Sequence, residues 1–311
     1  MLENSREILA VIHAIVLSAL YVGSLYMWDG SLAKSRNEPS QVRRRSISVL
    51  LSSLVSIIYS CLVYLFFGNH ESHQEMGLLS SMGFNFAQIH YQILAIIIAI
   101  FLNTCLFLGP IAEELEVDEV SKLNMDYIKR KIEWVCKSFV ELCTNLLEMS
   151  KLFTAFLLDE QKVIQDEQGL FSFRAIVMGP LTEEIVFRTC LHYLLYYYGG
   201  ISLLSSLLIA CLLFGVCHCH HIIEHVVHGQ MSITSALINV IVQFTYTSVF
   251  GFYCGYIYAK TSCILAAILL HAYCNQMGLP SFNMSKPIIA TFYVFGLISF
   301  WILLFPTLSI F

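Results

Sequence analysis

Residues 201–219 read ISLLSSLLIACLLFGVCHC and contain no Asp, Glu, Lys or Arg. A helix of this length rises about 28 Å, close to the roughly 30 Å thickness of the hydrocarbon core of a bilayer. Comparable apolar runs recur along the chain, and we expect eight to span a membrane. Their ranges are 8–28, 47–67, 86–108, 175–198, 201–219, 233–258, 262–280 and 288–306. The sequence therefore predicts an all-α, polytopic bundle of about eight transmembrane helices.

The composition supports a membrane protein and argues against other classes. Hydrophobic residues make up 57% of the 311 residues and charged residues 13%, against roughly 45–50% and 25% in soluble domains. The surplus apolar side chains must face lipid, because a soluble domain of this size does not need them for its core. The 17 basic and 22 acidic residues give little electrostatic support for a nucleic-acid partner. The eleven cysteines include no CxxC pair, so neither a disulfide framework nor a zinc ribbon is expected.

The distribution of basic residues predicts the orientation of the chain. The 29–45 loop carries five Lys and Arg residues, the 111–173 segment carries seven, and the 68–83 loop between them carries none. By the positive-inside rule, both basic segments face the cytosol and the N-terminus lies on the opposite side. We expect a single membrane domain, residues 1–311. Within it, 1–110 form three spans, 111–173 an amphipathic cytosolic insertion and 174–311 the core.

Ionisable side chains lie inside predicted spans, where they are costly and are therefore candidates for function. The first group is Glu183, Glu184 and Arg188. Adjacent positions on a helix point about 100° apart, so the two carboxylates cannot share one environment. Glu184 and Arg188 are spaced i,i+4 and can pair on one face, which leaves Glu183 free to act as a base. An ion pair that only joins helices is the alternative explanation.

Two further polar groups follow. The second group comprises five histidines within eleven residues: His218, His220, His221, His225 and His228. Of these, His218 lies nearest the membrane interior, whereas the others suit a solvated interface. The third group is His271 and Asn275, which share one helical face and can both donate hydrogen bonds, although such residues also join helices structurally. With Glu183 as base, these groups supply what attack of water on a carbonyl requires.

Three motifs occur in a fixed order on late spans. They are Glu183-Glu184-x-x-x-Arg188, Phe214-x-x-x-His218 and His271-x-x-x-Asn275. In this order they resemble the CAAX-protease and bacteriocin-processing superfamily of glutamic intramembrane proteases, and 214–224 resembles its Ras-converting CAAX endopeptidase branch. Looser matches occur upstream, at 36–39, 43–45 and 106–110. The strong resemblance covers 174–280, and one departure is Ala175, where the family pattern has Asn.

The resemblance implies both an activity and a location. Members of this branch are multi-pass proteases of the endoplasmic reticulum membrane, with a catalytic cavity open to the cytosol. They remove the C-terminal aaX tripeptide from prenylated CaaX proteins such as Ras-like GTPases. By this resemblance Glu183 activates water, His218 helps to position it, and His271 with Asn275 forms the oxyanion hole, with no metal or other cofactor. Residues implied as supports are Glu184 and Arg188, with His221 and Glu224 further out.

Two other functions remain open on the sequence alone. His221-Ile-Ile-Glu224-His225 matches the H-x-x-E-H motif of zinc proteases, and Glu183, His218 and His271 are also residue types that ligate zinc. Alternatively, the intramembrane Glu, Arg and His residues would carry protons or bind a solute in a transporter. No internal repeat supports the transporter.

Overall fold

The computed structural model describes most of the chain as helix. The described residues are 2–67, 78–84, 88–114, 167–229, 231–282 and 286–311. Most of the predicted 111–173 insertion lies outside them. The α-helices are α1 (Leu2–Ser24), α2 (Pro39–Phe67), α3 (Leu78–Ser81), α4 (Ile89–Leu106), α5 (Leu108–Glu114), α8 (Glu167–Phe173), α9 (Gly179–Glu184), α10 (Leu203–His218), α11 (His221–Val227), α12 (Ile233–Thr261), α13 (Ile264–Met277) and α14 (Pro287–Leu308). Three π-helical segments are η3 (Arg174–Met178), η4 (Ile185–Cys190) and η5 (Tyr193–Tyr198).

The predicted membrane bundle is confirmed. Within the described ranges, six helical segments are long and apolar enough to cross a membrane: α1, α2, α4, α10 with α11, α12 and α14. Helix α13 is apolar but shorter, at 14 residues. The predicted span at 175–198 coincides with an unbroken helical stretch that runs from α8 through η5. The main differences are at the helix ends. Helix α2 begins at Pro39 and includes three of the five basic residues that were expected in the preceding loop, Arg43, Arg44 and Arg45.

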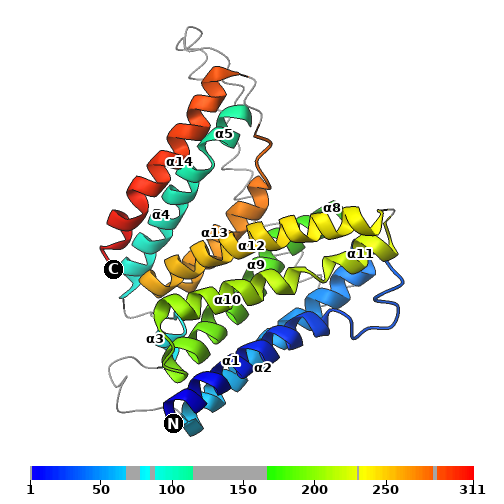
Figure 1. Ribbon diagram of the computed structural model, residues 1–311, viewed down its shortest axis with the longest axis vertical. Helices are drawn as coiled ribbons and strands as arrows, with labels where there is room; N and C mark the ends of the chain where they lie inside the picture. Colours follow the sequence, from blue (N-terminus) through cyan, green and yellow to red (C-terminus); the bar gives the residue numbers. More distant parts are fainter. Residues whose placement is uncertain (1, 68–77, 85–87, 115–166, 230, 283–285) are drawn as a thin grey trace.

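The helices form two groups joined by α12 and α13. Helices α1 and α2 lie side by side, and α14 lies beside α4 and α5 on the opposite side of the molecule (Figure 1). Helix α12 packs against α10 and α13 between these groups. At Gly296 of α14, an added Cβ would overlap the carbonyl oxygen of Cys105 in α4. Glycine is therefore required where the backbones of α14 and α4 approach each other.

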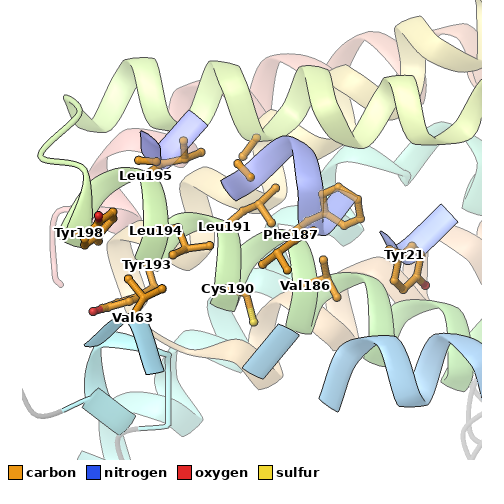
Figure 2. Packing of buried hydrophobic residues seen from close by; sticks show 14 of the residues in the cluster. Tyr21, Val63, Val186, Phe187, Cys190, Leu191, Tyr193, Leu194, Leu195 and Tyr198 are labelled. Atoms are coloured by element: carbon orange, nitrogen blue, oxygen red, sulfur yellow. The ribbon is translucent and has the colours of Figure 1, made fainter. Parts of the chain in front are cut away.

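The 167–198 stretch runs through the middle of a hydrophobic core. Its buried side chains are Val186, Phe187, Cys190, Leu191, Leu194 and Leu195, each no more than 1% exposed (Figure 2). Tyr21 of α1, Val63 of α2 and Phe214 of α10 belong to the same core. Burial of large apolar side chains at this density leaves them few alternative positions. The core thus fixes the rotation of the helix that carries both glutamates.

The backbone around the two glutamates is irregular and is tied to its neighbours. Helix α9 lies between the π-helical segments η3 and η4, and such i→i+5 turns are frequent at functional sites. Thr182 Oγ1 lies 2.8 Å from the hydroxyl of Tyr21 in α1. Ser53 of α2 donates to the carbonyl oxygen of Thr182 at 3.3 Å. These hydrogen bonds hold α9 against α1 and α2, one residue before Glu183.

Gly296→Ala tests the close contact between α14 and α4. The new methyl group would meet backbone, so we expect a loss of about 1–2 kcal/mol, despite the better helix propensity of Ala. The unfolding temperature in detergent should fall by several degrees. Gly23→Ala in α1 is the matched control, because nothing lies within 4 Å of its added Cβ. Equal effects of the two substitutions would contradict the packing described here.

Candidate active site

Glu184 and Arg188 form an ion pair in the centre of the bundle. Arg188 Nε lies 2.9 Å from Glu184 Oε2, and the two side chains are 2% and 0% exposed, respectively. The guanidinium also lies over the ring of Phe214 in α10, 4.6 Å from its centroid. This arrangement confirms the expected i,i+4 pairing. A buried charge without such a partner would be strongly unfavourable.

Two more helices reach the carboxylate of Glu184. His271 Nδ1 of α13 lies 2.7 Å from Glu184 Oε1, and Cys254 Sγ of α12 donates to Oε2 at 3.2 Å. Together with Arg188, these contacts satisfy both carboxylate oxygens. Glu184 is therefore a fixed, fully surrounded anion, and it connects α9 to η4, α12 and α13.

Glu183 has a different environment, although it is the next residue. Its side chain is 20% exposed, and its Oε2 lies 3.9 Å from the Nε2 atoms of both His218 and His271. No hydrogen-bond partner is found for Oε2 among the described residues. A separation of 3.9 Å is too long for a direct hydrogen bond, but one water molecule can bridge atoms at this distance. The expected difference between the two carboxylates is thus observed.

The hydrogen bonds of the two histidines determine which ring nitrogen faces Glu183. His218 Nδ1 lies 2.8 Å from the carbonyl oxygen of Phe214, which can only accept, so Nδ1 carries a proton. His271 Nδ1 donates in the same way to the carboxylate of Glu184. Both rings therefore present Nε2 to Glu183. In a neutral ring this Nε2 accepts a hydrogen bond, and in an imidazolium it donates one.

Asn275 lies one helical turn beyond His271. Its Nδ2 donates to the carbonyl oxygen of Ala175 at 2.8 Å, and the side chain is exposed. This bond joins α13 to η3, at the beginning of the helix that carries Glu183. The acceptor is a backbone atom, so Ala175 needs no polar side chain for this bond. The second hydrogen of the Asn275 amide remains for another acceptor.

The H-x-x-E-H residues have partners on other elements. His221 Nδ1 lies 2.9 Å from Gln243 Oε1 of α12. Glu224 Oε1 lies 3.2 Å from Arg45 Nη1 of α2. Within the described ranges, no group of three or more His, Cys, Asp and Glu side chains is arranged to hold a metal ion. His221 and Glu224 therefore join α11 to its neighbours in this structure.

Cys254 is the contact that the sequence did not reveal. In the sequence it resembles the other cysteines of the apolar runs, which behave as small hydrophobic side chains. Its thiol reaches Glu184 only through the tertiary fold, in which α12 packs against α10 and α13. No pattern within α12 could have indicated this, because the two residues are 70 positions apart.

The fold and the site define a polytopic membrane protein with an intramembrane glutamate–histidine centre. Residues 166–277 match the family model described as type II CAAX prenyl endopeptidase Rce1-like. The chain is 30% identical over 273 residues to CAAX prenyl protease 2 of Homo sapiens, covering 88% of this chain and 71% of that protein. It is 28% identical to the probable CAAX prenyl protease 2 of Schizosaccharomyces pombe, covering 85% and 79%. The chain belongs to the CAAX prenyl protease 2 family of membrane peptidases, which confirms the resemblance seen in the sequence. No solved structure matches it significantly.

Arg188→Leu tests the importance of the central ion pair for stability. The substitution leaves the Glu184 carboxylate buried without its cation, so we expect a loss of about 3–5 kcal/mol or failure to fold. Thermal unfolding in detergent measures the effect. Lys260→Leu is the matched control, since Lys260 is exposed at the end of α12 and should contribute less than about 0.5 kcal/mol. Similar unfolding temperatures for the two variants would contradict this role.

Proposed function

We propose that this protein removes the C-terminal aaX tripeptide from prenylated CaaX proteins, using water activated by Glu183. One observation carries the mechanism: Glu183 Oε2 lies 3.9 Å from the Nε2 atoms of both His218 and His271. The neighbouring carboxylate is neutralised by Arg188, so Glu183 is the carboxylate available as a base. The names of the relatives supply the substrate class, and Ras-like GTPases fit it.

In the proposed reaction, one water molecule lies between Glu183 and the two histidines. Glu183 accepts a proton from this water as its oxygen attacks the carbonyl carbon of the prenylated cysteine. His218 accepts a second hydrogen bond from the water through Nε2 and so orients it. The C–N bond then breaks, and the proton held by Glu183 passes to the nitrogen of the departing tripeptide. The cysteine is left with a free carboxylate, and no covalent enzyme intermediate forms.

The negative charge on the carbonyl oxygen requires donors that are already in position. The Glu184 carboxylate holds the His271 ring through Nδ1, and in the imidazolium form Nε2 can donate a hydrogen bond. Asn275 can contribute its second amide hydrogen, while the first is bound to Ala175. We therefore propose His271 and Asn275 as the oxyanion hole. Glu184, Arg188 and Cys254 then act as positioning residues, because they touch His271 or each other and not the substrate.

We also propose that the protein lies in the endoplasmic reticulum membrane, with the site open to the cytosol. The basic loop between α1 and α2 supports this orientation. Its backbone and side chains contact Glu224 and Arg174, which places the loop at the end of the bundle near the histidines. The positive-inside rule assigns such an end to the cytosol. In the proposed topology 174–311 form the protease core, and 111–173 form a cytosolic insertion.

Glu183→Gln tests the proposed base. The amide keeps the size of the side chain but cannot accept the proton, so kcat should fall by about 10²–10⁴-fold. The assay is release of the tripeptide from a farnesylated CaaX peptide by purified protein in detergent. Glu114→Gln, an exposed glutamate in α5, should retain wild-type activity. Wild-type turnover by Glu183→Gln would rule out this mechanism.

Chelation separates the proposed mechanism from that of a zinc protease. Cleavage should persist in EDTA or phenanthroline, because the proposed reaction uses a carboxylate base. His225→Ala should also remain active, although it removes the last residue of the H-x-x-E-H motif. If chelators abolished cleavage and zinc restored it, the metalloprotease hypothesis would replace the one proposed here.

A further inference from the structure

Four charged residues gather where the loop between α1 and α2 meets η3 and α11. This basic cluster comprises Arg36, Arg45, Arg174 and Glu224. Arg45 pairs with Glu224 at 3.2 Å and donates to the carbonyl oxygen of Ser31 at 3.0 Å. The Arg36 backbone N–H donates to Glu224 Oε2 at 3.4 Å. The chain at Arg36 is thus held in place from α11.

Arg174 holds the same turn from the other side. Its two Nη atoms each donate to Asn37 Oδ1 at 3.2 Å, and Nη1 also donates to the carbonyl oxygen of Arg36 at 3.1 Å. Glu224 is the one anion among the four members of the cluster, and its carboxylate pairs directly with Arg45. Burial and the nearby charges of Arg36 and Arg45 lower the pKa of Arg174, and Glu224 raises it. The cluster has a surplus of positive charge, which favours an anionic ligand.

Arg36 is the member of the cluster that can bind such a ligand. Its contacts with described residues are made by its backbone, and no hydrogen bond or ion pair of its guanidinium is found within the described ranges. The charge of Arg36 acts on His220, His221 and Tyr246. The ring of His221 lies 5.9 Å from that of His218. His221 is therefore close both to the charge of Arg36 and to His218 of the proposed water site.

The spacing suits a short peptide bound between Glu183 and this cluster. Arg174 precedes Glu183 by nine residues on one helical stretch, which corresponds to about 13 Å at the ordinary helical rise. Three extended residues span about 10 Å, and an arginine side chain covers the remaining distance. The departing tripeptide ends in an α-carboxylate, whatever its side chains. Guanidinium is the side-chain group that best matches a carboxylate, because it donates two parallel hydrogen bonds.

We propose that Arg36 binds the free C-terminal carboxylate of the substrate, on a turn held in position by Arg174 and Glu224. This inference rests on the proposed function. It assigns the specificity for a chain terminus to a residue outside the membrane bundle. It also explains why the loop between α1 and α2 is tied to both η3 and α11, since a binding residue must be held rigidly to be selective.

The test compares a farnesylated CaaX peptide with a free carboxylate and the same peptide with a C-terminal amide. For the wild-type protein, amidation should raise KM about tenfold to a hundredfold, the usual value of a charge-assisted hydrogen bond. Arg36→Ala should raise KM for the free peptide by a similar factor and leave kcat nearly unchanged. For the Arg36→Ala variant, amidation of the peptide should then raise KM by less than about twofold. Arg36→Lys should restore part of the preference, because it keeps the charge without the planar fork.

Two controls keep the outcomes distinct. Lys34→Ala removes another cation of the same loop, one exposed and paired with Glu38, and should keep the wild-type preference for the carboxylate. Higher salt should raise KM for the free peptide more than for the amide, which tests the inference without any substitution. The inference would be overturned if Arg36→Ala kept the wild-type preference for the free carboxylate over the amide. It would also be overturned if Arg36→Ala weakened cleavage of both peptides equally, and did so only when the protein was assayed in anionic vesicles. If the wild-type protein cleaved neither peptide, the proposed function itself would fail.

Discussion

The structure depends on one buried carboxylate, that of Glu184. An ionised group in the middle of an apolar bundle is tolerated only when neighbouring groups replace its hydration. Arg188 supplies the opposite charge from the same helix, and His271 and Cys254 supply hydrogen bonds from α13 and α12. These contacts require three segments of the chain to meet at one point. A different packing of α12 or α13 would remove the hydrogen bonds that Cys254 and His271 make to this carboxylate.

The same contacts create the difference between two adjacent glutamates. Because Glu184 takes Arg188, the carboxylate of Glu183 is left without a cation and faces two imidazole Nε2 atoms. The hydrophobic core around 186–195 fixes the rotation of the helix, so this division cannot be reversed by a small turn of the backbone. A structural ion pair and a candidate base thus arise from neighbouring positions. Glu184 of the ion pair also orients the His271 ring, which faces Glu183.

At the polar end of the bundle, a second carboxylate, that of Glu224, also joins separate elements through an arginine, and it is more exposed than Glu184. Glu224 joins α11 to α2 through Arg45 and to the loop after α1 through the backbone of Arg36, and Arg174 joins that loop to η3. The elements that carry His218 and Glu183 are therefore braced at this end of the bundle. Two residues of the H-x-x-E-H motif at 221–225 have structural contacts, since His221 is held by Gln243 and Glu224 by Arg45.

The sequence by itself determined the membrane fold, the approximate spans and the pairing of Glu184 with Arg188. Each of these depends on periodicity or on spacing within one helix, which a linear pattern records. It also identified the family, because three motifs occur in a fixed order. The approach of Cys254 to Glu184, the bond from Asn275 to Ala175 and the division of roles within the H-x-x-E-H run were decided only by the tertiary structure. These contacts join residues on separate helices, and their geometry depends on how the helices rotate and cross when their apolar faces pack together.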